Sequence, residues 1–79
     1  MPIIVAPINQ VLKVVKVLAD DKTKHHLENL GIMQNSEVIV LSHSNGDVII
    51  KVKETRLALN KDIALKILVA WKEKLWKSI

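Results

Sequence analysis

The chain has 79 residues, of which 49% are hydrophobic and 25% are charged, with a formal net charge of +4 and no cysteine. This length fits one domain with a single hydrophobic core, and the composition is that of a folded chain. The absence of cysteine excludes disulfides, thiolate metal sites and thiol nucleophiles. Two tryptophans without phenylalanine or tyrosine exclude the aromatic sheet on which single-strand RNA binders stack bases.

Half of the positive excess lies in residues 70–79, whereas residues 1–69 are nearly balanced and contain the only arginine, Arg56. Nucleic-acid binding requires basic side chains concentrated on one face, so this distribution argues against nucleic acid as the partner. No apolar stretch reaches the roughly 18 residues of a membrane helix, and Met1–Pro7 lacks the features of a secretory signal. We therefore expect a soluble, cytoplasmic protein without a membrane span.

The first predicted element is a strand over Leu12–Leu18, a segment rich in β-branched residues with polar residues on both sides. Lys13 and Lys16 differ in parity, so strict alternation would place them on opposite faces of a sheet. Either the strand contains a bulge near Val14-Val15, or one lysine extends to solvent from a strand end.

A short helix is predicted next, capped by Asp20 or Asp21 and ended by Gly31 in a left-handed conformation. Such a short helix is marginal in isolation, so we expect Leu27 and Leu30 to pack on the strands. In the turn that follows, Asn35 is the residue best able to take a positive φ.

Two strands joined by a hairpin follow, Val38–Leu41 and Val48–Val52, with Asn45-Gly46 as the turn. In the second strand, alternation places three apolar side chains on the inner face and makes the outer face basic. The inner residues are Val48, Ile50 and Val52, and the outer ones are Lys51 and Lys53.

Thr55–Leu59 is predicted as a further short strand. The pattern then supports two interpretations, a helix capped by Asn60, or one helical turn at Lys61–Ala64 with a buried strand over Ile63–Val69. Residues 70–79 have the pattern of an amphipathic helical segment, whose apolar stripe comprises Trp71, Leu75, Trp76 and Ile79.

Several motifs follow one another over about residues 8–69, namely Leu27–Ile32, Val38–Leu41, Gly46, Arg56–Leu59, and Ala64 with Ile67. Their order resembles that of the FeoA family of small ferrous iron transport proteins. The resemblance implies a mainly β fold, a closed SH3-like barrel of five strands with one helix inserted after the first strand. It favours a strand near Leu65–Val69, which gives a barrel over residues 1–69 and a C-terminal extension over residues 70–79.

The same resemblance implies a role in iron homeostasis, as a cytoplasmic accessory protein of the FeoB ferrous iron transporter, whose cytoplasmic portion carries a GTP-binding domain. The chain departs from the family pattern at two places. Gln34-Asn35 stands where the family typically has Pro-Gly, and Glu54 stands where it often has Gly. Asn35 can take a left-handed conformation, whereas Glu54 would be strained in one.

Catalytic, metal and cofactor chemistry find little support in the residues. His25 and His26 are adjacent, so on a helix they diverge by about 100° and cannot chelate together, and His43 lies far along the chain. No serine has the spacing of a nucleophile with its base, and no Gly-rich phosphate loop is present. We expect no enzyme activity, no metal site, no cofactor and no small-molecule substrate.

Protein binding is the remaining hypothesis. Candidate contact residues are the polar and apolar side chains around the end of the helix and the two tryptophans, namely Lys24, His25, Met33, Gln34, Asn35, Trp71 and Trp76. The tryptophans either cover an open end of the barrel or form a surface for a partner or a second copy, which leaves a homodimer possible. The alternative function is a stand-alone SH3-like regulatory domain related to those of iron-dependent repressors, or a basic nucleic-acid binder.

Overall fold

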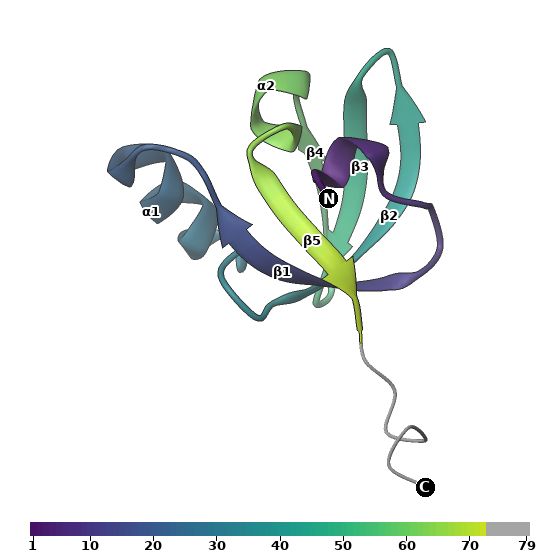
Figure 1. The fold of residues 1–79 in the computed structure, drawn as a ribbon, viewed down its shortest axis with the longest axis horizontal. Helices are drawn as coiled ribbons and strands as arrows, with labels where there is room; N and C mark the ends of the chain where they lie inside the picture. The colour runs from purple at the N-terminus through teal and green to yellow at the C-terminus, as the bar shows by residue number, and fades with distance from the viewer. Residues whose placement is uncertain (73–79) are drawn as a thin grey trace, which may run out of the picture.

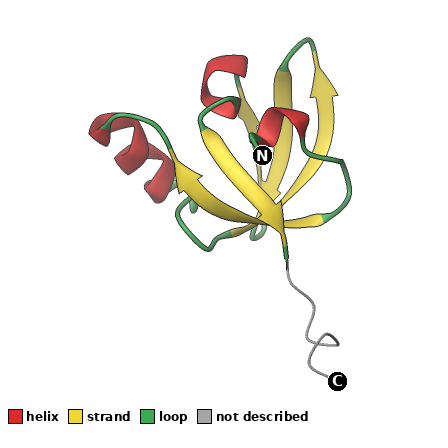
Figure 2. Ribbon diagram, viewed as in Figure 1, coloured by secondary structure: helices red, strands yellow, loops and turns green. Residues whose placement is uncertain are grey.

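Five antiparallel strands form one sheet in the order β4-β3-β2-β1-β5 (Figures 1 and 2). The computed structural model describes residues 1–72. In chain order its elements are η1 (Ile3–Val5), β1 (Val11–Val17), α1 (Asp21–Asn29), β2 (Glu37–Ser44), β3 (Asp47–Val52), β4 (Thr55–Leu59), α2 (Lys61–Ala64) and β5 (Ile67–Trp71). The mainly β architecture, with a helix after the first strand, confirms the predicted fold class.

The sheet is not closed into a barrel, which corrects one detail of that prediction. β4 and β5 are its two edges and are not paired with each other. The N-terminal segment lies along β5 instead, where Pro2 forms an isolated bridge with Leu68. η1 contacts both α2 and β5 (Figure 1), and Ile3 is fully buried. The core is therefore completed by η1 and α2, where a closed barrel would pair its edge strands.

The core is built from the inward-facing residues that alternate along the strands of the sheet. β3 shows the pattern most clearly, because Val48, Ile50 and Val52 are buried whereas Lys51 is exposed, as predicted. Among residues 1–72 every buried side chain is apolar. Burial at about 25 cal/mol per Å² of apolar surface is the main stabilising contribution.

β1 contains the bulge that the lysine spacing indicated. Its pairing with β5 shifts register between Val14 and Lys16. Its pairing with β2 covers only the first part of the strand, Val11–Lys13. Beyond that point the Val14 amide donates to Ser36 O at 2.9 Å, and the Asn35 amide donates to Val14 O at 2.8 Å. The turn after α1, and not a strand, therefore covers this side of β1 at the bulge.

α1 begins and ends as predicted, with Asp20 accepting a 3.1 Å hydrogen bond from the Thr23 amide at the N-terminus. Gly31, at φ +92°, ends the helix. The Ile32 amide donates to Leu27 O at 2.9 Å, which is the long hydrogen bond of a Schellman cap.

The expectation that Leu30 packs on the strands was wrong, because its side chain is 38% exposed. Leu30 is the C-cap residue of α1, and the chain reverses at Gly31. Ile32, which is only 1% exposed, then takes the buried position beside Leu27. The helix is thus anchored by one leucine and by the residue that follows its cap.

The turns confirm two predictions and correct a third. Asn35 has φ 74°, and Asn45 and Gly46 have φ 54° and 89°. The family pattern, which often has Gly at position 54, suggested a positive φ for Glu54, but Glu54 does not have one. Lys53, the preceding residue of the β3–β4 loop, takes it at φ 55°.

The ambiguous C-terminal stretch contains a helical turn and a strand. Asn60 caps α2 by accepting from the Ile63 amide at 2.9 Å. β5 starts at Ile67 and continues through Ala70 and Trp71, two residues that the sequence pattern had assigned to an amphipathic helix. They are in a strand because β1 extends far enough to pair with them, with Leu12 opposite Trp71. Residues 73–79 of that predicted helix lie outside the described residues.

Candidate protein-interaction site

A cleft of about 490 Å³ lies between β1, α1 and the turn after α1. α1 projects to one side of the sheet beside the end of β1 (Figure 1). Its lining comes from three consecutive segments of the chain, namely the end of β1, α1 and the turn after it: Val15, Lys16, Val17, Lys24, Glu28, Met33 and Gln34.

The turn over Met33–Ser36 forms one wall of the cleft and is held in place by a serine. Ser36 Oγ accepts from the Met33 amide at 3.1 Å and donates to Gly31 O at 2.8 Å. Asn35 takes the left-handed third position of the turn, which Gly usually occupies in a type II turn. This fixed backbone presents the Met33 side chain to solvent, with 42% of its surface exposed.

The other wall is an unpaired length of strand edge. The Leu18 amide donates to Lys66 O at 2.7 Å, so Leu18 faces β5. Because backbone groups alternate in direction along a strand, the N–H and C=O of Val17 point away from β5 toward the cleft. Among residues 1–72 these two groups have no backbone partner. Unpaired strand groups can pair with another chain, and here the partner strand would have to enter the cleft, because Val17 as a whole is only 7% exposed.

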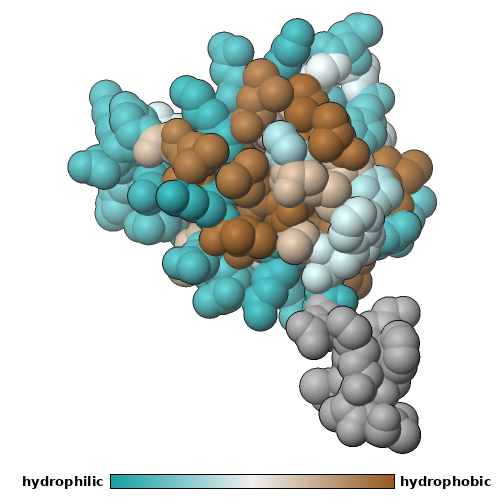
Figure 3. All heavy atoms as spheres, in the orientation of Figure 1, coloured by the Kyte–Doolittle hydropathy of each residue, from teal (hydrophilic) through white to brown (hydrophobic). Residues whose placement is uncertain are grey.

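The cleft combines apolar contact area with charges of both signs. Val15, at the bulge, is 47% exposed. Lys16 and Lys24 contribute positive charge and Glu28 negative charge, and Glu28 Oε1 lies 3.7 Å from His25 Nδ1. Figure 3 also shows hydrophobic side chains gathered over the face formed by η1, β5 and β1. The arrangement can accept a peptide segment with an apolar anchor.

Three of the predicted contact residues, Lys24, Met33 and Gln34, line this cleft together. His25 lies on the same helix at the edge of the cleft, and the Asn35 backbone holds the turn against β1. Their role as contact residues stays a prediction.

The cleft residues on β1 and Glu28 were not predicted. The parity break between Lys13 and Lys16 had indicated the bulge, but it did not indicate that the bulge would leave the edge of Val17 open.

Trp71 lies apart from the cleft, at the end of β5. Its indole N–H donates to Gln10 Oε1 at 2.6 Å, and 59% of the residue is exposed. Trp71 therefore does not cover the core, contrary to one of the two interpretations of the tryptophans. Trp76, the second predicted tryptophan contact, lies outside the described residues.

His43 lies apart from the adjacent residues His25 and His26 in the described part of the chain. His43 Nε2 is 3.2 Å from Ala6 O, whereas His25 and His26 are exposed on α1. Within residues 1–72 no group of three or more His, Asp or Glu side chains is placed to hold a metal ion. No helix in this range is long and apolar enough to cross a membrane.

One carboxyl group at the start of α1 has a shifted pKa. Hydrogen bonds from the side chain and backbone of Thr23 lower the pKa of Asp20 below its ordinary value. The cap at the start of α1 is therefore strongest when Asp20 is ionised.

Comparison with known proteins identifies a family. A family model described as the FeoA domain matches residues 1–70. No curated protein matches the chain. A crystal structure of an iron uptake regulatory protein, FeoA, is 26% identical with a TM-score of 0.77, over 89% of this chain and 93% of that one.

Two further solved structures show the breadth of the fold. FeoA from Stenotrophomonas maltophilia in complex with zinc, described as a procaryotic SH3 domain protein, is 24% identical with a TM-score of 0.75, over 89% of each chain. A manganese-dependent transcriptional repressor is 17% identical with a TM-score of 0.81, over 91% of this chain and 41% of that one. The predicted SH3-like fold is confirmed. The fold by itself does not separate a transport accessory protein from a regulatory domain.

Proposed function

Because the chain belongs to the FeoA domain family, we propose that it is a cytoplasmic, non-enzymatic accessory protein of ferrous iron uptake. In this proposal it binds the cytoplasmic GTP-binding domain of a FeoB-type transporter and changes the transporter's activity by protein contact. The family association with ferrous iron transport is the premise, and the transporter as direct partner is the step beyond it.

The observation that carries the proposal is the cleft between α1 and β1, where an open strand edge lies beside exposed apolar side chains. An extended partner segment can pair with the N–H and C=O of Val17 and thereby extend the sheet. One of its apolar side chains would then pack between Val15 and Met33. Main-chain pairing supplies affinity in such an interaction, and the side-chain contacts supply specificity.

Calorimetric titration of the full chain with the purified GTP-binding domain from the same organism tests this proposal. We expect saturable binding, and we expect Met33→Glu to weaken it by about tenfold or more, as loss of a buried interface anchor does. Leu65→Glu is the matched control, because Leu65 is 46% exposed and outside the cleft. Its affinity should stay within about twofold of the unmodified chain.

GTP turnover of the transporter domain is the second readout. Addition of the unmodified chain should change the turnover rate, and Met33→Glu should reduce that effect while Leu65→Glu preserves it. Absence of binding to every part of the transporter, or equal weakening by both substitutions, would contradict the proposal.

A further inference from the structure

Basic residues that are distant in the chain lie close together on the outward face of the sheet. Val11 on β1 lies opposite Ile39 on β2, Ile39 lies opposite Lys51 on β3, and Lys51 lies opposite Arg56 on β4. Residues paired across strands point to the same side of a sheet. These four side chains therefore form one row on the outer face.

The charges on and beside this row are strongly asymmetric. The group comprises five exposed basic residues and two exposed acidic residues, an excess of three, against a formal net charge of +4 for the whole chain. We call this surface the basic face, and it consists of Lys13, Lys51, Lys53, Arg56, Lys72, Glu37 and Glu54. Lys13 is paired with Glu37 across β1 and β2, and Lys72 Nζ lies 2.8 Å from Glu37 Oε2.

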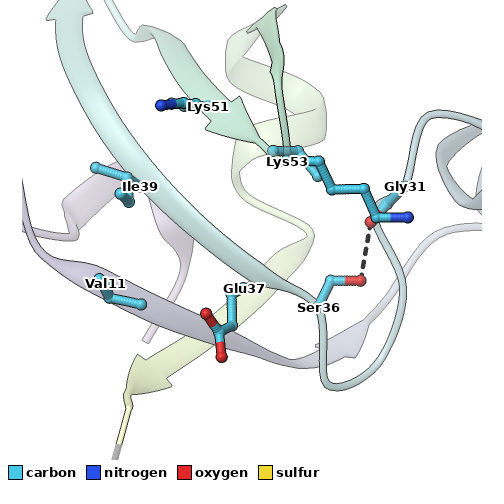
Figure 4. Close-up of a pocket in the computed structure, with 8 residues that line it drawn as sticks. Val11, Gly31, Ser36, Glu37, Ile39, Lys51 and Lys53 are labelled. Atoms are coloured by element: carbon cyan, nitrogen blue, oxygen red, sulfur yellow. Dashed lines mark hydrogen bonds between the residues drawn. The ribbon is translucent and has the colours of Figure 1, made fainter.

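A groove of about 380 Å³ opens on the basic face (Figure 4). Val11 and Ile39 supply apolar lining, and Glu37, Lys51 and Lys53 supply charged lining. Figure 4 shows these side chains on β1, on β2, on β3 and just after β3. The groove shares no lining residue with the cleft between α1 and β1.

Two features of the basic face oppose folding. Lys51 and Arg56 are directly opposite each other, and like charges in that position are destabilising. Lys53 has φ 55°, a conformation that is unfavourable for a lysine. Within residues 1–72 neither Lys51, Lys53 nor Arg56 has a carboxylate within ion-pair distance. An anionic ligand would relieve the repulsion between them.

We propose that the basic face binds an acidic, extended segment of a partner protein, with an apolar side chain of that segment in the groove. The concave apolar lining fits a single side chain, whereas a bilayer surface would require apolar side chains that protrude. Glu37 lies among the cations and would repel the phosphates of a nucleic acid, whereas a peptide can place its carboxylates on either side of it.

The test uses a synthetic, fluorescently labelled decapeptide of alternating glutamate and leucine residues, titrated with the full chain at low and moderate salt. We expect saturable binding that weakens as salt rises, and no binding of the same peptide with lysine in place of glutamate. Lys51→Glu should weaken binding by about tenfold or more. This substitution also places opposite charges at the Lys51 and Arg56 pair, so it should not impair folding.

Lys22→Glu is the matched control, since it changes net charge equally on α1, away from the basic face and the groove. Its affinity for the peptide should stay within about twofold. Equal weakening by both substitutions would overturn the proposal by showing attraction to net charge alone. Tighter binding to duplex DNA or to phosphatidylglycerol vesicles than to the peptide would also overturn it.

Discussion

The substitution Lys53→Gly should make the protein more stable and a weaker binder of acidic peptides. Lys53 occupies the left-handed region at φ 55°, as the first of the two residues that join β3 to β4. Left-handed backbone costs an L-residue about 1 to 2 kcal/mol, which glycine avoids. Glycine also increases the conformational entropy of the unfolded chain, and this reduces the gain in stability by about 0.4 to 1 kcal/mol.

The midpoints of these two ranges leave a net gain of about 0.8 kcal/mol in the free energy of unfolding. For a domain of this size it corresponds to a rise in Tm of about 3 to 6 °C. Thermal and urea unfolding followed by circular dichroism measure it. The same variant should bind the glutamate-leucine peptide more weakly, because one cation of the basic face is lost.

Lys53→Gln is the matched control, since it removes the charge but keeps a side chain that is strained in the left-handed region. It should lose peptide affinity without the gain in stability. A Lys53→Gly variant that is less stable than the unmodified chain would refute the reasoning about backbone strain.

Three further predictions concern the fold. Gly31→Ala should lower the free energy of unfolding by about 1 to 2 kcal/mol, because φ is +92° and a Cβ would lie 3.2 Å from Val52 Cγ1. Urea unfolding measures this loss, and an unchanged midpoint would contradict the prediction. Ile50→Ala should cost about 2 to 5 kcal/mol in the same assay, since Ile50 is fully buried. Because Thr23 lowers the pKa of Asp20, the ionised carboxylate stabilises the fold above its ordinary pKa, and this stabilisation is lost as the pH falls below about 4. The Tm of Asp20→Asn should therefore decrease less on acidification than the Tm of the unmodified chain. Identical profiles of Tm against pH would contradict this prediction.

Local patterns predicted the elements whose structure is determined by adjacent residues. The caps at Asp20 and Gly31, the turn at Asn45-Gly46 and the inner face of β3 all follow from backbone preference or alternation, and all are present. The resemblance added what local patterns left open, the strand that became β5.

Features that depend on contacts between distant segments were not predictable in the same way. The first residues of the chain gave no strand pattern, yet Pro2 pairs with Leu68 and Ile3 fills the core. Trp71 fitted an amphipathic helix by spacing alone, but the length of β1 places it in β5. The open edge at Val17 likewise arises because β2 pairs only with the first part of β1.

Amide hydrogen exchange at Val17 tests the central claim most directly. In the free protein its N–H points into the cleft without a backbone partner among residues 1–72, so its exchange should be faster than that of the paired Leu18 amide. On saturation with the GTP-binding domain of the transporter, we expect exchange at Val17 to slow by about tenfold or more. Saturable binding that leaves Val17 unchanged and protects other amides instead would contradict strand pairing in the cleft.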